Sequence, residues 1–179
     1  MNIVEPIKNK FEIKNVEKVL KKNKRDLLLF IIGINTGLRI SDILSLNVCD
    51  VKNKDYVDLI EQKTGKYKKF PLNIKIKNLL KTYIKDKSEE KPLFESIYNN
   101  RLERTYVYRV IKKACLKAGI KNKIGTHTLR KTFGYHHYKK FKDIALLQKI
   151  FNHNSPQITL RYIGIEQEEI DESYRKFIL

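Results

Sequence analysis

The side chains that could perform covalent chemistry are arginines, histidines, a lysine and a tyrosine near the ends of predicted elements. The sequence has no zinc-protease, phosphate-loop or nucleophile-elbow motif, and no dense group of acids for a two-metal site. An enzyme that acts on a phosphate without metal ligands must neutralise it with cationic side chains, and it needs a covalent nucleophile or a positioned base. The candidates for these roles are Arg39, Lys63, His127, Arg130, His153 and Tyr162.

Several candidates stand where helices are expected to begin or end. Arg39 follows the glycine that ends a long apolar stretch, and His153 closes a second one. His127 and Arg130 are three residues apart, so they share a face if a helix begins there. Tyr162 follows nine residues after His153.

The charge balance indicates a polyanionic partner. The chain has 38 lysines and arginines against 20 aspartates and glutamates, a net charge of +18. Residues 163–179 carry five acidic and two basic side chains, which leaves a net charge of +21 on the preceding 162 residues. Such a charge favours nucleic-acid binding, although a lysine-rich protein can be basic without touching DNA. The acidic, apolar-studded tail suggests a second surface with a different partner.

Composition predicts an intracellular, cytoplasmic protein of one domain. Hydrophobic residues make up 41% of the chain, enough for a core and too many for a disordered basic tail. The longest dense apolar stretch, residues 27–34, is far shorter than the roughly 20 residues of a membrane span, so no membrane partner is expected. The chain begins without a signal-peptide pattern, and its two cysteines are too few for a disulfide framework.

The hydrophobic periodicity predicts a mainly α fold, formally α+β, with one small antiparallel β-hairpin. Gly37 ends a buried helix over 24–36. Strands over 56–61 and 67–72 are joined by a turn in which Gly65 supplies a positive φ and Lys63 lies at the tip. Further helices are predicted at 14–22, 40–46, 76–84, 107–118, 129–140, 144–151 and 170–179.

Four sequence boxes carry the candidate residues in a fixed order. They are TGLRISDILSL, QKTGKYKKFPL, HTLRKTF and FNHNSPQITLRY. Together they resemble the catalytic domain of the tyrosine recombinases, the phage integrase family, over about residues 24–179. Each box alone is weak, but all four in order are very hard to obtain by chance.

The resemblance implies a reaction on DNA and a role for each residue. Tyr162 would attack a phosphate and hold the 3′ end covalently, while Arg39 and Arg130 would bind the non-bridging oxygens with planar, bidentate forks. Lys63 would protonate the departing 5′-oxygen. No metal and no cofactor are expected, because the phosphodiester energy is kept in the phosphotyrosine.

Two histidines and an acid complete the implied site. His127 would take the tyrosine proton or hydrogen-bond the phosphate, and His153 would donate to a non-bridging oxygen. The sequence does not divide these roles further. Asp42 either orients active-site groups or is a first-turn acid that favours its helix N-terminus.

The remaining basic residues near these boxes are predicted to contact DNA. Lys66, Lys68 and Lys69 are rivals of Lys63 for the acid role, and we assign them to non-specific phosphate contacts. Arg109 lies on the basic face of the 107–118 helix, which is either solvated or placed in a DNA groove.

The resemblance also predicts how the chain is divided. Residues 1–23 are expected to be a lead-in or linker, loose over 1–12, and residues 24–179 the catalytic domain. Family members usually carry an N-terminal helical domain that completes a clamp around DNA, so the chain is either an excised catalytic part or a naturally short member. Phe151 and Asn152 replace the usual leucine-glycine before His153, which puts the local turn in question.

The C-terminal helix, 167–179, bears an apolar stripe. In the family such a helix docks on a neighbouring protomer, which implies a homo-oligomer, a tetramer, on double-stranded DNA. The alternative, favoured for an isolated fragment, is that the helix folds back on its own domain. The stripe consists of Ile170, Tyr174, Phe177 and Ile178.

The implied function is site-specific recombination that integrates or excises a mobile element of bacterial or phage origin. A first alternative keeps the fold but not the chemistry: a DNA-binding regulator or decoy without productive cleavage. A second alternative is a tyrosine-type topoisomerase that acts as a monomer without paired sites.

Overall fold

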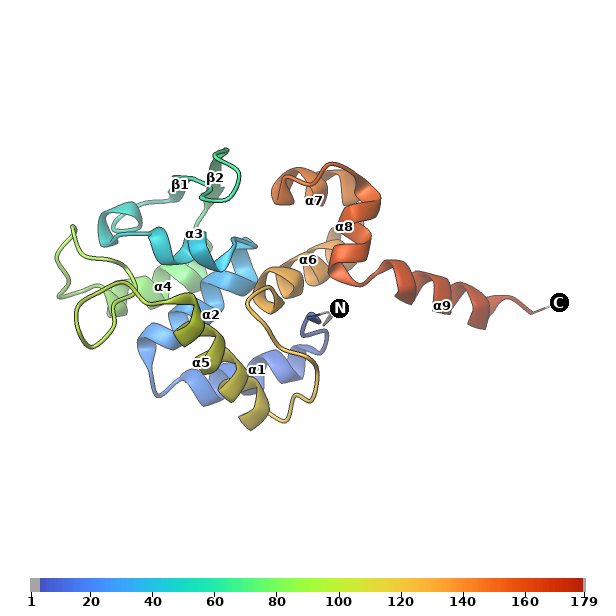
Figure 1. The fold of residues 1–179 in the computed structure, drawn as a ribbon, viewed down its shortest axis with the longest axis horizontal. Coiled ribbons are helices and arrows are strands. Elements are labelled where there is room, and N and C mark those ends of the chain that lie inside the picture. Colours follow the sequence, from blue (N-terminus) through green and yellow to red (C-terminus); the bar gives the residue numbers. More distant parts are fainter. Residues whose placement is uncertain (1–3, 179) are drawn as a thin grey trace.

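The computed structural model describes residues 4–178 and confirms a mainly helical fold with one two-stranded antiparallel sheet (Figure 1). Within those residues, no helix is both long and apolar enough to cross a membrane. The elements in chain order are α1 (Lys10–Leu20), α2 (Lys24–Thr36), α3 (Ile40–Ser45), the 3-10 turn η1 (Val48–Asp50), β1 (Tyr56–Ile60), β2 (Tyr67–Pro71), α4 (Ile74–Tyr83), α5 (Arg104–Lys117), α6 (Thr128–Phe141), α7 (Ile144–Phe151), α8 (Pro156–Ile163) and α9 (Glu166–Lys176).

Helix α2 forms the centre of the main core because its side chains are apolar on nearly every face. It packs against α1, α3, α4 and α6 (Figure 1). Gly37 ends the helix with a φ of +64°, as predicted. A Cβ at Gly37 would lie 2.4 Å from the Phe133 ring, so a side chain there would force α6 away from α2.

The described part of the N-terminal segment belongs to the domain, so the lead-in or linker predicted over 1–23 is wrong there. Helix α1 begins four residues before its predicted start and buries Val16 and Leu20 against the core. Ile7 is buried as well, and its N–H donates to the Thr132 hydroxyl at 2.9 Å. The segment is rich in lysine and has one narrow apolar face, which obscured its packing in the sequence.

The hairpin rests on the core at its open end and extends its turn outward. Val57 pairs with Phe70 and is buried, whereas Ile60 and Tyr67, paired near the turn, are exposed. Gly65 has a φ of +64°, which confirms the predicted turn. The residues of this turn are therefore presented at the surface.

A second, smaller apolar cluster joins α6, α7 and α8. Helix α7 has its predicted bounds. Helix α8 was not predicted; it begins at Pro156, with the Ser155 hydroxyl accepting from Ile158 N at 3.3 Å. The cluster consists of Tyr135, Leu147, Phe151, Ile163 and Ile165.

Helix α9 extends away from the body (Figure 1), so the expectation that it folds back on its own domain is wrong. None of its residues over Glu166–Lys176 is buried, and the Tyr174 side chain is 79% exposed. Its first turn is held by an ion pair of 2.8 Å between Lys139 and Glu168. The apolar stripe beyond that turn is free of its own domain.

Candidate active site

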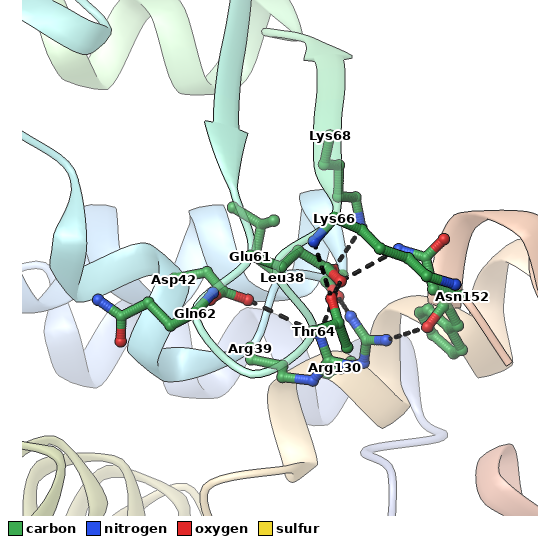
Figure 2. Close-up of polar contacts among 12 residues, drawn as sticks. Leu38, Arg39, Asp42, Glu61, Gln62, Thr64, Lys66, Lys68, Arg130 and Asn152 are labelled. Atoms are coloured by element: carbon green, nitrogen blue, oxygen red, sulfur yellow. Dashed lines mark hydrogen bonds and ion pairs between the residues drawn. The ribbon is translucent and has the colours of Figure 1, made fainter.

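Arg130 is buried in the first turn of α6, where it joins two segments. Its guanidinium donates to the carbonyl oxygen of Gly37 and, at 2.8 Å, to that of Phe151. Arg39, immediately before α3, lies beside it (Figure 2). Burial and the charge of Arg39 both lower the pKa of Arg130. Two guanidiniums held this close form a site for an anion.

Two buried carboxylates flank Arg39. Its Nη1 lies 3.0 Å from Glu61 Oε2 and 3.9 Å from Asp42 Oδ2. Asp42 Oδ1 accepts from the Gln62 N–H at 3.0 Å, so this acid joins α3 to the start of the hairpin turn (Figure 2). Asp42 lies in the first turn of α3 with its side chain fully buried, so its position fits both roles considered for it, orienting active-site groups and favouring the helix N-terminus.

Tyr162 lies on α8 with its hydroxyl against His127. The distance from Tyr162 Oη to His127 Nδ1 is 3.1 Å. Burial raises the pKa of Tyr162, and the nearby guanidiniums of Arg130 and Arg39 oppose that rise without cancelling it. Burial and the positive charges around His127 lower its pKa. At neutral pH a neutral imidazole therefore faces a neutral phenol.

His153 lies on the other side of Tyr162. The two rings meet edge to face with centroids 5.2 Å apart. Burial, together with the charges of Arg130 and Arg39, lowers the pKa of His153 to about 4. Its Nδ1 is 3.1 Å from the Thr159 hydroxyl, and this contact fixes the orientation of the ring.

A surface cavity of about 390 Å³ opens between the hairpin turn, α5 and the start of α6. It is lined by Arg39, Lys63, Arg104 and His127, among others. The charge of Lys63 contributes to the lowered pKa of His127. The structure therefore brings all six sequence candidates into one continuous group.

The four predicted DNA contacts do not share one environment. Lys66, Lys69 and Arg109 are exposed. The Lys68 side chain is only 10% exposed, and its Nζ donates to the Ile150 carbonyl at 2.9 Å. Burial and the charge of Arg130 lower the pKa of Lys68 to about 8. Lys68 thus points inward, towards Glu61 and Ile150, unlike the other three predicted DNA contacts.

The described residues concentrate cations rather than metal ligands at this site. Over 4–178, no group of three or more histidine, cysteine, aspartate or glutamate side chains is placed to hold a metal ion. The acids that are present, Asp42 and Glu61, face Arg39.

Comparison with known proteins identifies the group of proteins in which this arrangement occurs. The model of the phage integrase family matches residues 9–169. The chain belongs to the phage integrase family. It is 48% identical over 179 residues to the probable integrase/recombinase YoeC of Bacillus subtilis, covering 99% of this chain and 98% of YoeC. It is 30% identical to a tyrosine recombinase of Pseudothermotoga lettingae, covering 93% of this chain but 59% of that protein.

Solved structures of phage integrase relatives share the fold. The crystal structure of XerA recombinase superposes with a TM-score of 0.79 at 22% identity, covering 97% of this chain and 65% of XerA. A lambda integrase dimer bound to a COC′ core site gives a TM-score of 0.73 at 17% identity, covering 93% of this chain and 49% of that one. The chain thus spans about half to two thirds of these longer proteins.

Three residues next to the site were not predicted from the sequence. Arg104 begins α5 and lines the cavity, although it looked like one cation among many. In the sequence Glu61 is the polar last residue of a predicted strand, but its side chain is fully buried. Asn152 was noted only as a departure from leucine-glycine, yet its amide donates to Glu61 Oε2 at 3.0 Å. The one signal in the sequence was the position of an acid, Glu61, directly before the predicted lysine-rich turn.

Proposed function

We propose that this chain is a site-specific tyrosine recombinase that cuts and rejoins double-stranded DNA through a 3′-phosphotyrosine. The observation that carries the proposal is the contact of 3.1 Å between Tyr162 Oη and His127 Nδ1, beside the paired guanidiniums of Arg39 and Arg130. A nucleophile, a base and an anion site therefore meet in one place.

The first step is attack by Tyr162. Because burial raises its pKa, the phenol is neutral at pH 7 and needs a base. His127, whose lowered pKa keeps it neutral, accepts the phenol proton at Nδ1. Tyr162 Oη forms a bond to phosphorus as the bond from phosphorus to the 5′-oxygen breaks. Attack by another 5′-hydroxyl reverses these transfers and releases the tyrosine.

Charge on the phosphate oxygens is met by the arginines and His153. Planar guanidiniums suit a phosphate that gains charge in the transition state. The Thr159 hydroxyl donates to the Ser155 carbonyl at 3.2 Å, so it offers lone pairs to His153 Nδ1–H. Protonation of Nε2, favoured once a phosphate lies beside it, then provides the donor to a non-bridging oxygen.

Lys63 is assigned as the acid that protonates the 5′-oxygen. It lines the same cavity as Arg39 and His127, on an exposed turn that DNA can reach. Lys68, with a pKa lowered to about 8, has a suitable acidity, but its Nζ is bonded to the Ile150 carbonyl. Geometry therefore favours Lys63.

Assembly and biological setting extend the same proposal. The exposed stripe of α9 is assigned to docking on a second copy, giving a tetramer on paired DNA sites inside the cell. A lambda integrase tetramer bound to a Holliday junction is among the similar structures, at a TM-score of 0.73. The similarity to YoeC, a probable integrase/recombinase, supports integration or excision of a mobile element.

The test is a covalent trap with nicked double-stranded DNA, tried on candidate attachment sites without added metal. Wild type should form an adduct that survives denaturing electrophoresis, and Tyr162→Phe should form none. Tyr98→Phe is the matched control, because Tyr98 is 78% exposed and lies outside the site. DNA binding without an adduct would favour the regulator. An adduct and relaxation of supercoiled DNA without paired sites would favour the topoisomerase.

A further inference from the structure

Asn152 adopts a backbone conformation that most side chains avoid. It caps the C-terminus of α7 with φ +54° and ψ +40°, in the left-handed region where glycine is least strained. Asparagine tolerates this region better than other residues with a Cβ. Its amide uses the position to donate to Glu61 Oε2 at 3.0 Å, across 91 residues of chain.

Glu61 receives contacts from three segments on one oxygen. Oε2 accepts from the Thr64 hydroxyl at 2.7 Å and from Asn152 at 3.0 Å, and it lies 3.0 Å from Arg39 Nη1 (Figure 2). Burial raises the pKa of Glu61, but these hydrogen bonds and the charge of Arg39 outweigh burial and keep the pKa below its ordinary range. The carboxylate is therefore ionised beside Arg39.

The three contacts set the position of Oε2 relative to Arg39. Without the amide of Asn152, Oε2 is drawn only toward Thr64 and Arg39, and it can approach the guanidinium more closely. Arg39 Nη1 is buried and has no well-formed hydrogen bond to any residue in 4–178. A tighter pair with Glu61 would change the orientation of the Arg39 guanidinium, and a bidentate contact to a phosphate depends on that orientation.

We propose that Glu61 and Asn152 are positioning residues. Their bond sets the segment that carries His153 against the hairpin that carries Lys63, and it holds Glu61 where the carboxylate orients the guanidinium of Arg39 for phosphate. The inference rests on the proposed function, because its main consequence is a rate of DNA cleavage. Neither residue touches the phosphate itself.

The decisive variant is Asn152→Gly, since it removes the amide while relieving the left-handed backbone. A residue that serves only the turn would be replaced by glycine without loss. The positioning role predicts about tenfold slower single-turnover adduct formation, the size expected for losing a hydrogen bond to a charged group. DNA affinity should be unchanged, and the melting temperature should fall only slightly, because relief of the left-handed backbone offsets part of the lost hydrogen bond. The matched control is Asn53→Gly, an exposed asparagine with φ +56°, which should react at the wild-type rate.

A double-mutant cycle with Glu61→Gln tests whether the two residues act together. Substituting Asn152 should cost much less in the Glu61→Gln background than in wild type, because the shared bond is already weakened. Equal costs in both backgrounds would overturn the proposal. An unchanged adduct rate in Asn152→Gly would also overturn it, while leaving the recombinase function intact.

A readout that needs no cleavage separates the two proposals. The Gly65 N–H donates to the Glu61 carbonyl at 2.8 Å, so its hydrogen exchange reports on the hairpin turn. Exchange at Gly65 should be faster in Asn152→Gly than in wild type or Asn53→Gly. If wild type forms no adduct but Gly65 exchange rises, the function fails and the structural link stands. Unchanged exchange would contradict the link whatever the cleavage result.

Discussion

The main core and the C-terminal cluster hold their parts of the site in different ways. Arg39 and Arg130 come from segments that pack around α2, deep in the main core. Tyr162 lies on α8 and His153 in the loop between α7 and α8, and the apolar anchorage of these two helices is the small cluster around Phe151. The phosphate-binding half is thus fixed by burial of apolar surface on several sides.

Polar bonds connect the nucleophile half to the rest. Arg130 donates to the Phe151 carbonyl, and Lys68 donates to the Ile150 carbonyl. A hydrogen bond weakens steeply as its length and angle depart from their best values, whereas the stabilisation from apolar burial does not depend on direction. The anion site therefore rests on the larger apolar core, whereas the segment that carries the tyrosine rests on a small apolar cluster and on directional polar bonds.

The largest effect is expected at Arg130, the residue shared by both regions. Arg130→Lys keeps the charge but cannot donate in two fixed directions to Gly37 and Phe151. Adduct formation should fall about 10²–10³-fold, as for loss of one preorganised donor to an oxyanion. Single-turnover rates at saturating DNA measure this. A loss smaller than tenfold would mean that charge alone suffices.

The next effect compares two left-handed glycines, one in each region. Gly37→Ala places a Cβ 2.4 Å from Phe133, whereas Gly164, with φ +73°, has open space around the same atom. Gly164→Ala should cost roughly 1–2 kcal/mol for the backbone alone, and Gly37→Ala about 1–3 kcal/mol more for overpacking. Urea unfolding of both variants gives the free energies. Equal losses would contradict the rigid contact between α2 and α6.

Much of the fold follows from local pattern. Helices over 24–36 and 144–151 and the hairpin were predicted because apolar periodicity and glycine positions agree there. Helix α8 was not predicted because it has only eight residues and they are mixed in polarity. The packing of Ile7 depends on Thr132, 125 residues away, so no local pattern could reveal it.

The site divides in the same way. The six candidate residues could be identified from the order of their boxes in the sequence, and the structure brings them together. The roles given to them are proposals. The inward turn of Lys68 and the burial of Glu61 depend on how the hairpin meets α7, a tertiary contact. Strand alternation alone does not predict that either side chain reaches Arg39 or Ile150.

Acid should loosen the C-terminal cluster before the main core. His153 has a pKa of about 4 in the folded protein against an ordinary value of 6.5. Between these values the unfolded chain binds a proton that the folded chain does not, so the free energy of unfolding falls as pH drops from 6.5 towards 4. His153→Gln should lose less stability than wild type between pH 7 and pH 5.

Urea unfolding at both pH values measures this difference, and hydrogen exchange locates it. Protection factors, which are exchange rates corrected for the intrinsic pH dependence of amide exchange, should fall for amides of α7 and α8 at pH 5 and change little for those of α2. His127→Gln is the comparison, because His127 immediately precedes α6 and lies outside the segment of α7 and α8 that carries His153. An unchanged pH dependence in His153→Gln would assign the acid response elsewhere.

The smallest effect on stability is expected in α9, which belongs to neither region. Because Ile170 and Tyr174 are exposed, the double variant Ile170→Ser/Tyr174→Ser should change the free energy of unfolding by no more than about 0.5 kcal/mol. The same variant should lose assembly on DNA with paired sites, measured by light scattering, while Ile97→Ser, at an isoleucine that is 85% exposed and outside α9, should keep it. Intact assembly would remove α9 from the proposed interface, and a large loss of stability would mean that the helix docks on its own domain in solution.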